Sequence, residues 1–235
     1  MARWLLLALA LLLAAPAPAL ELLPTTLQLA PGQDRTELWL YNPGPTRWQG
    51  QLRVLAWDQQ LDAERLHDSD QMLASPARLD LPAGTRQRVW LLPSPTAVPA
   101  TGGEQAFRVL LEPDSPGLPR YSLPLFSGLP SYTTAPQVRA RLDADGQAPR
   151  LWLENTGPLH ARLSELMYEA ADGQRSVLLP GLAGYVLAGR QRRWALPPRA
   201  DGYAGGRFLA RLQDGVEAVL TRPAGQIAPA AAAGL

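Results

Sequence analysis

Residues 118–126 read LPRYSLPLF and alternate large apolar residues with other side chains. This alternation predicts a β-strand with Tyr121, Leu123 and Leu125 on one face. The segment also contains two prolines, which cannot donate to a sheet ladder and therefore favour an edge strand. Proteins normally cover an apolar edge strand, and one that is kept open is typical of a strand that pairs with another chain. We therefore interpret this segment as a strand that binds a partner through its backbone.

The start of the chain has the pattern of an export signal. Arg3 gives a positive start, residues 4–14 are apolar, and Ala17-Pro18-Ala19 is an A-x-A cleavage site. The apolar run is shorter than the roughly 20 residues that span a bilayer, and no later run reaches that length. We predict cleavage after Ala19, export, and no membrane insertion of the mature chain.

The composition excludes several classes of site. The chain has 235 residues, no cysteine and a formal charge of +1. Without cysteine, an exported protein is held together by packing alone, and thiolate metal sites and thiol nucleophiles are excluded. The balanced charge does not favour nucleic acid, which needs a concentrated basic face. The sequence has no lysine, so all 22 basic residues are arginines and any basic role falls to arginine.

Short apolar runs separated by turn residues extend through the chain, which predicts an all-β sandwich protein. The first series comprises residues 25–29, 37–41, 49–57, 87–92, 105–111 and 121–126. The second series comprises residues 137–142, 150–154, 161–168, 176–179, 192–196, 207–212 and 216–221. Residues 162–171 also fit a helical period, but we favour a strand because the neighbours are strands and Asp172-Gly173 closes a turn.

The two series predict two β-sandwich domains behind the signal peptide at 1–19. The first domain covers residues 20–127 and carries the partner-binding strand. The second covers residues 128–223. Residues 224–235 are alanine-rich without periodicity, which predicts a disordered tail.

Residue patterns for catalysis or metal binding are weak. We interpret His67 as a solvated loop residue and His160 as a residue with a local hydrogen-bonding role. The run Asp143-Ala144-Asp145-Gly146 resembles part of a calcium loop, but it lacks the other ligands and a hairpin turn is favoured. Asp68 and Asp70 have the acidic side chains of a glycosidase pair, but close acids are common in polar loops. We therefore predict no catalytic residue, no metal site, no cofactor and no enzymatic activity.

The chain has seven tryptophans. Exposed tryptophans in a groove would favour a carbohydrate-binding protein. We instead place Trp39, Trp57, Trp90 and Trp152 in the core or between sheets, because all four lie in predicted strands.

Short motifs recur in order along both series of strands. In the first series they are LQLAPGQ at 27–33, LWLYN at 38–42, VLAW at 54–57, LASP at 73–76, LPAGTRQ at 81–87, EQAFRVLL at 104–111 and YSLPLF at 121–126. In the second they are LENTG at 153–157, HAR at 160–162 and GYVLAG at 184–189. In this order and spacing they resemble the PapD-like periplasmic chaperones of chaperone–usher pili, in particular the archaic branch. The resemblance covers nearly all of the mature chain, although no single motif is specific.

The resemblance implies an L-shaped pair of immunoglobulin-like domains in the periplasm. It implies that the protein binds pilus subunits (pilins) whose sandwich lacks its last strand and delivers them to an outer-membrane usher. The strand lent to the subunit would be the one before the interdomain linker, with subunit-binding residues Leu118, Tyr121, Leu123 and Leu125.

Two departures from the family concern this strand. The family usually grips the subunit's C-terminal carboxylate with two basic residues, and the equivalent positions here are Thr26 and Pro124. Arg108 and Arg120 are the candidate replacements, since arginine binds a carboxylate with two hydrogen bonds. Both could equally be solvent-facing strand arginines. The loop at 113–117 is also short, which predicts that the strand fills fewer pockets of the subunit.

Two other functions remain open from the sequence. The chain could be an exported structural or adhesive protein with two sandwiches and no client subunit. It could also be a carbohydrate-active protein.

Overall fold

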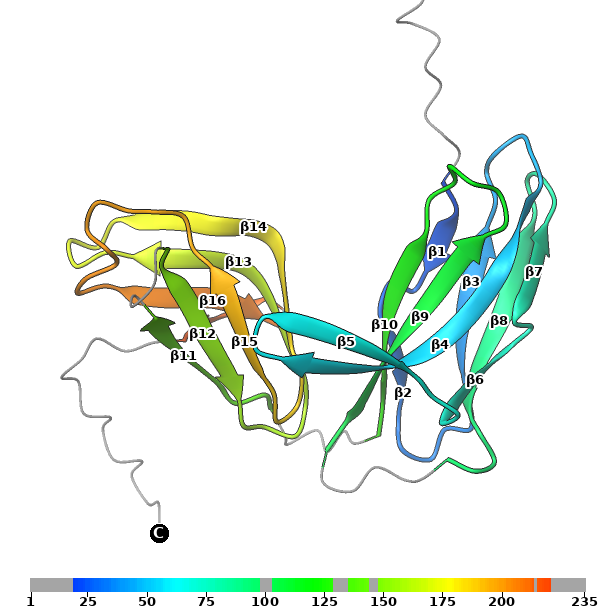
Figure 1. Ribbon diagram of the computed structural model, residues 1–235, viewed down its shortest axis with the longest axis horizontal. Coiled ribbons are helices and arrows are strands. Elements are labelled where there is room, and N and C mark those ends of the chain that lie inside the picture. The colour runs from blue at the N-terminus through cyan, green and yellow to red at the C-terminus, as the bar shows by residue number, and fades with distance from the viewer. Residues whose placement is uncertain (1–18, 98–102, 129–134, 144–147, 214, 221–235) are drawn as a thin grey trace, which may run out of the picture. The chain divides into compact units, whose positions relative to one another are not determined.

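A computed structural model of the protein describes residues 19–97, 103–128, 135–143, 148–213 and 215–220. This part of the chain is all-β and contains no helix, which confirms the predicted class. It falls into two compact units (Figure 1). Among the described residues, the first unit contains 19–56, 68–97 and 107–126, and the second contains 57–67, 103–106 and the remainder from 127 onward.

The first unit is built on two sheets. One sheet has the strand order β1-β3-β8-β6, and the other has the order β2-β10-β9-β4-β5 with β7 also paired to β4. The strands are β1 (Glu21–Leu23), β2 (Leu27–Leu29), β3 (Thr36–Tyr41), β4 (Trp48–Gln60), β5 (Ala63–Asp68), β6 (Met72–Ser75), β7 (Arg78–Leu81), β8 (Arg86–Pro93), β9 (Gln105–Pro113) and β10 (Tyr121–Ser127). The outer strand β5 is almost entirely part of the second unit.

Strand alternation decides which side chains fill the first core. In β3, Leu38 and Leu40 are fully buried, whereas Trp39 between them is 38% exposed. In β9, Val109 and Leu111 are likewise fully buried. Burying each such side chain contributes roughly 1.5–3 kcal/mol. Packing of this kind therefore replaces the disulfides that the chain lacks.

The second unit also contains two sheets, with the orders β11-β12-β15 and β14-β13-β16-β17. The strands are β11 (Val138–Asp143), β12 (Arg150–Asn155), β13 (Ala161–Glu169), β14 (Arg175–Val186), β15 (Gln191–Ala195), β16 (Arg207–Leu212) and β17 (Val216–Val219). The choice of strand over helix for 162–171 is confirmed by β13. A bulge at Glu165, whose φ is 48°, puts Leu163 and Leu166 in the same core, which explains their helix-like spacing.

An aromatic cluster anchors the second core. Tyr168 packs edge-on against Tyr203 at 5.0 Å between ring centroids, and Phe208 lies 5.2 Å from Tyr168. The buried hydroxyl of Tyr203 donates to the Pro197 carbonyl at 2.6 Å. The Tyr168 hydroxyl donates to the Ala204 carbonyl at 3.2 Å, so both tyrosines bury the apolar ring while the hydroxyl is hydrogen-bonded.

A buried asparagine closes a turn of the first sandwich. Asn42 follows β3 and is 3% exposed. Its Nδ2 donates to the carbonyl oxygens of Thr46, Leu81 and Pro82, and its Oδ1 accepts from the N–H of Gly44. The side chain thus satisfies backbone groups of two loops at once.

Asn155 makes the same set of contacts in the second sandwich. It is the last residue of β12, is 1% exposed, and begins the sequence NTGP where Asn42 begins NPGP. Its Nδ2 donates to the carbonyl oxygens of Leu159, Val186 and Leu187, and its Oδ1 accepts from the N–H of Gly157. The two sandwiches therefore stabilise corresponding turns with the same kind of buried asparagine.

The structure contains strands that the sequence pattern did not predict. These are β1, β5, β6 and β7. The strands β1, β6 and β7 have only three or four residues, and every residue of β5 is exposed. Only β7, with the sequence RLDL, alternates polar and apolar residues, and its four residues are too few to predict a strand from the pattern alone.

The prediction that strand tryptophans are core residues is correct only for Trp57, which is 4% exposed. Trp39 is exposed, and Trp90 and Trp152 are half-buried. Each of these three lies between two buried neighbours on its strand, so the alternation turns the indole outward.

Some predicted features lie outside the described residues. They are the signal peptide apart from Ala19, the alanine-rich tail and most of the Asp143–Gly146 turn.

Candidate functional site

β10 is the strand predicted from residues 118–126, and it lies between β2 and β9 in its sheet (Figure 1). The prediction of an edge strand is therefore wrong. However, β2 has three residues and β10 has seven, so β2 can accompany less than half of β10. A proline in β10 can thus lie where no ladder bond is needed. Part of the outer side of β10 has no neighbouring strand within the described part of the chain.

Tyr121 fixes the start of β10. Its hydroxyl oxygen accepts a hydrogen bond of 2.6 Å from the backbone N–H of Leu20. Leu20 is buried just before β1, so this bond ties the beginning of the described chain to the beginning of β10.

The four predicted subunit-binding side chains face the core of the first unit. Leu123 and Leu125 are 8% and 0% exposed and belong to that core. Leu118 and Tyr121 are half-buried and pack against it. Only Leu118 and Tyr121 therefore keep apolar surface that a partner could contact without unfolding the strand.

The two candidate anchor arginines lie at different ends of the β9–β10 hairpin. Arg120 directly precedes β10 and is exposed, next to the end of β9 at Pro113. Arg108 is half-buried near the start of β9, opposite Leu55 of β4. At about 3.3 Å per residue, Arg108 and Pro113 are roughly 17 Å apart along the strand. The structure therefore does not bring the two arginines together around one carboxylate.

The positions equivalent to the family's basic residues differ in exposure. Thr26 is exposed, and Pro124 is buried in β10. Neither offers a charged donor. Arg120 is exposed and directly precedes β10, and it makes no ion pair or hydrogen bond with any described residue.

The two histidines lie in different surroundings. His67 is exposed as predicted, but it lies in β5 rather than in a loop. His160 contacts a residue far away in the sequence. Its Nδ1 lies 2.6 Å from Oε2 of Glu104, a residue 56 positions earlier, and sequence spacing could not have revealed this pair. Asp68 pairs with Arg53 at 2.8 Å.

The described residues give no support to a metal site. No group of three or more histidine, aspartate or glutamate side chains lies close enough together there to hold an ion. The same residues include no helix long and apolar enough to cross a membrane.

A second surface, which the sequence pattern did not predict, covers the outer face of the β1-β3-β8-β6 sheet. The guanidinium of Arg88 lies 5.2 Å from the ring centre of Trp39 and 4.2 Å from that of Trp90. A groove of about 450 Å³ beside them is lined by Leu23, Trp39, Tyr41 and Arg86, among others. The position of Trp39 between two inward leucines was the signal that predicts its outward direction.

This surface does not favour the hypothesis that the protein is carbohydrate-active. Sugars stack on open aromatic faces, whereas Arg88 occupies faces of Trp39 and Trp90. In the second unit, the guanidinium of Arg141 likewise lies over Trp152, at 4.1 Å from the ring centre.

No protein-family model and no curated protein matches the chain. Solved structures do match it, among them a chain of the CsuC–CsuE chaperone–tip adhesion subunit pre-assembly complex from the archaic Csu pili of Acinetobacter baumannii. That match has 22% identity and a TM-score of 0.70, and it covers 86% of this chain and 98% of the other.

Two further matches are similar in extent. The E. coli chaperone DraB has 16% identity and a TM-score of 0.59, covering 85% of this chain and 93% of its own. A chain of the Salmonella enterica SafA pilin–SafB chaperone complex has 16% identity and a TM-score of 0.57, covering 87% and 95%. Other chaperones recur among the matches, including a class 5 fimbriae chaperone and a periplasmic chaperone. The chain therefore has the fold of the periplasmic chaperones of chaperone–usher pili.

Proposed function

We propose that the protein is a periplasmic chaperone that binds pilus subunits by strand complementation and passes them to an outer-membrane usher. The single observation that carries this proposal is the incomplete cover of β10 by the three-residue β2. The fold supports it, since matched structures include a chaperone with a tip adhesion subunit and a chaperone with a pilin. We also propose export through a signal peptide cleaved after Ala19.

The chemistry of binding follows from the open side of β10. A subunit that lacks a strand exposes apolar core and unpaired backbone groups, which another chain's strand can satisfy. Each backbone hydrogen bond contributes roughly 0.5–1.5 kcal/mol net. The half-buried Leu118 and Tyr121 add apolar contact beside these bonds. Leu123 and Leu125 contribute indirectly, because their burial in the core keeps β10 in place.

The same arrangement supports a binding protein rather than an enzyme. We propose two domains, at 20–127 and 128–223, with the subunit-binding strand in the first. The matched folds belong to chaperones, and strand complementation is association through backbone and apolar groups.

We expect Leu118→Asp to reduce capture of a subunit at least tenfold. Leu118 is half-buried at the entry to β10, so a carboxylate there would be desolvated by an arriving subunit strand. The measurement is co-purification of tagged protein with a pilin-like subunit encoded beside its gene and co-expressed in the periplasm. Val177→Asp is the control, because Val177 is an exposed apolar residue of β14 in the second unit. Equal capture by the two variants would contradict a binding role for this end of β10.

Arg120→Ala is expected to weaken capture of the same subunit about tenfold if Arg120 holds its terminal carboxylate, since a charged hydrogen bond contributes roughly 1.5–3 kcal/mol. Arg139→Ala is the matched control, because Arg139 is an exposed arginine on β11. The subunit amidated or extended at its C-terminus should bind wild type and Arg120→Ala alike. A subunit that binds Arg120→Ala as well as wild type would place the anchor elsewhere.

The alternative is an exported structural or adhesive protein with no client. It predicts that wild-type protein captures no subunit under any of these conditions.

A further inference from the structure

Strands β4 and β9 of the first unit's large sheet end within the second unit. β4 belongs to the first unit up to Ala56 and to the second from Trp57, and β9 enters the first unit at Phe107. Ala56 is paired with Phe107 in the antiparallel β4–β9 ladder. Residues 57–59 and 104–106 therefore continue the same end of this strand pair. Two side chains there, those of Gln59 and Glu104, are almost completely buried.

The side chain of Gln59 hydrogen-bonds two backbone groups of the second unit. It is 1% exposed, although it is a neutral polar residue that prefers water. Its Nε2 donates to the Tyr185 carbonyl at 3.0 Å, and its Oε1 accepts from the Leu187 N–H at 2.8 Å. One side chain thus satisfies a carbonyl and an N–H at the end of β14. Nearby Trp57 packs edge-on against Tyr185 at 5.7 Å between ring centroids.

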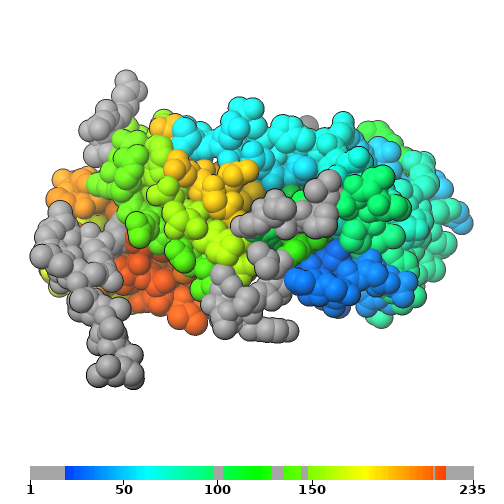
Figure 2. Space-filling view, turned by 90° about the horizontal axis from the view of Figure 1, so that it is seen from below, coloured from blue at the N-terminus to red at the C-terminus, as the bar shows by residue number. Residues whose placement is uncertain are grey.

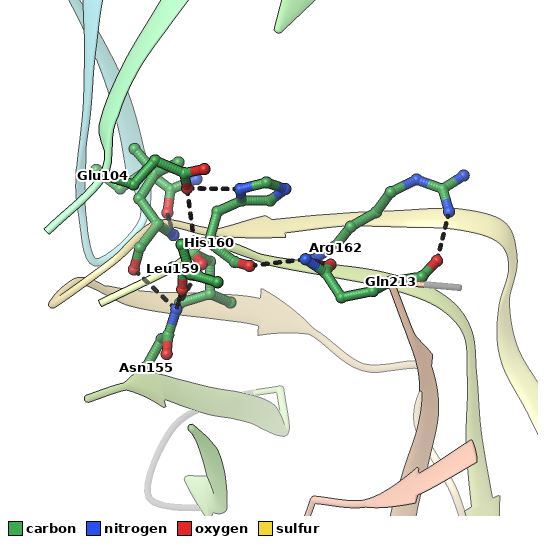
Figure 3. Close-up of polar contacts among 9 residues, drawn as sticks. Glu104, Asn155, Leu159, His160, Arg162 and Gln213 are labelled. Carbon is green, nitrogen blue, oxygen red and sulfur yellow. Dashed lines mark hydrogen bonds and ion pairs between the residues drawn. The ribbon is translucent and has the colours of Figure 1, made fainter. Parts of the chain in front are cut away.

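Glu104 holds the start of the β9 segment (Figure 3). Its Oε2 accepts from the His160 N–H at 2.9 Å and lies 2.6 Å from Nδ1 of His160, and its side chain is 2% exposed. The backbone N–H of Glu104 donates to the Pro158 carbonyl at 2.9 Å. The His160 carbonyl in turn accepts from Gln213, whose Oε1 accepts from the Arg162 N–H. A continuous series of hydrogen bonds therefore connects Glu104 with β13 of the second sandwich.

An outer ring of contacts supports this end of β4. The Leu61 carbonyl accepts from the Arg193 N–H at 3.0 Å, so the hairpin between β4 and β5 adds a bond to the edge of β15. Asp62 forms an ion pair with Arg193. Figure 2 shows the cyan surface of the hairpin next to the yellow-orange surface that includes β15. These exposed ion pairs contribute less than the buried bonds of Gln59 and Glu104.

A further ion pair joins Asp58 and Arg190 at 2.5 Å. Burial raises the pKa of Asp58, but the hydrogen bond and charge of Arg190, together with a backbone hydrogen bond at Gln59 and the charge of His67, leave that pKa below its usual value. Asp58 is therefore ionised at neutral pH, and its ion pair with Arg190 adds to the contacts that fix the end of β4.

We propose that Gln59 and Glu104 are positioning residues that clamp the β4–β9 strand pair in the second sandwich and so hold β9 in place for its neighbour β10. The clamp consists of Gln59 with Tyr185 and Leu187, and of Glu104 with Pro158 and His160. Its effect on subunit capture rests on the proposed function. Its effect on β4 and β9 does not, because the contacts lie within this chain.

Hydrogen exchange of the full mature chain tests the clamp without any subunit. Gln59→Leu keeps the volume but removes the donor and the acceptor, and Gln60→Leu is the control at the exposed neighbouring position. We expect the backbone N–H groups of residues 55–59 and 104–108 to exchange at least tenfold faster in Gln59→Leu and unchanged in Gln60→Leu. The N–H groups of β12 and β16 should keep wild-type rates. Unchanged rates at 104–108, or equal acceleration throughout the second unit, would overturn the proposal.

Glu104 offers a rescue experiment. Glu104→Ala removes the acceptor for His160, whereas Glu104→Gln keeps a carbonyl oxygen that accepts from the His160 N–H. We expect Glu104→Ala to accelerate exchange at 104–108 at least tenfold and Glu104→Gln to restore most of the protection. Equal acceleration in both variants would show that charge rather than hydrogen bonding holds the segment, and would overturn this part of the clamp.

Subunit capture provides the second readout. With the co-expressed pilin-like subunit, Gln59→Leu and Glu104→Ala should capture several-fold less than wild type, and Gln60→Leu should not. Wild-type capture by both variants, despite faster exchange, would overturn the link to β10. Absence of capture by the wild type would contradict the proposed function, while the exchange results would still decide the clamp.

Discussion

Replacing Leu125 by alanine is expected to lower the free energy of unfolding of the first unit by about 2–5 kcal/mol, the range for leucines truncated in a packed core. Leu125 is 0% exposed and belongs to the same core as the buried residues of β3 and β9. Truncation would lose the transfer free energy of the removed carbons and leave a cavity. Urea unfolding followed by tryptophan fluorescence measures the change.

Ser122→Ala is the matched control for this experiment. Ser122 lies on the same strand but is exposed, so its substitution should stay within about 0.5 kcal/mol of wild type. If Leu125→Ala unfolded like wild type, Leu125 would not be part of the core and would be available to a partner strand. The experiment therefore separates a side chain that fills the chain's own sandwich from one that is lent to a subunit.

Asn155→Ala is expected to destabilise the second unit by about 2–4 kcal/mol. The substitution removes the Nδ2 that donates to Leu159, Val186 and Leu187. A buried carbonyl left without a donor costs roughly 1–3 kcal/mol, and partial hydration of the loop offsets some of that cost. The shift in the urea midpoint measures the effect.

Two variants identify the role of the amide at this position. Asn155→Asp keeps an acceptor for Gly157 but has no donor, so it should be at least as destabilising as alanine. Thr156→Ala changes the exposed neighbour and should have little effect. A small effect of Asn155→Asp would contradict the view that donation to the three carbonyls is what stabilises the turn. Asn42→Ala should act in the same way on the first unit, because Asn42 makes the equivalent bonds.

Much of the fold was predictable because alternation of apolar residues is a local property. Strands such as β3, β9 and β13 have an inward row of leucines or valines, and the turns between strands contain glycine, proline or asparagine. The bulge at Glu165 puts Leu163 and Leu166 in one core although they are three residues apart, a spacing that is also typical of a helix. The turn at Asp172-Gly173 was a reason to predict a strand. The three-residue β1 and the exposed β5 lacked that signal.

The candidate site was predictable only in part. The alternation in LPRYSLPLF placed Tyr121, Leu123 and Leu125 on one face, and all three do face the first core. Whether these side chains pack in the chain's own core or against a partner depends on which sheet covers that face. The covering sheet is formed by segments far away in the sequence. The same holds for His160, whose partner Glu104 cannot be identified from spacing.

By itself the sequence determined the all-β class, the two series of strands and the absence of thiol chemistry. These follow from local periodicity and composition, which act within a few residues. Only the tertiary structure decided that the short β2 lies beside β10, that Leu125 is a core residue, and that Gln59 and Glu104 are buried in the second unit. Those features arise from pairing between strands far apart in the chain, where hydrogen-bond satisfaction and burial are settled by which segments meet.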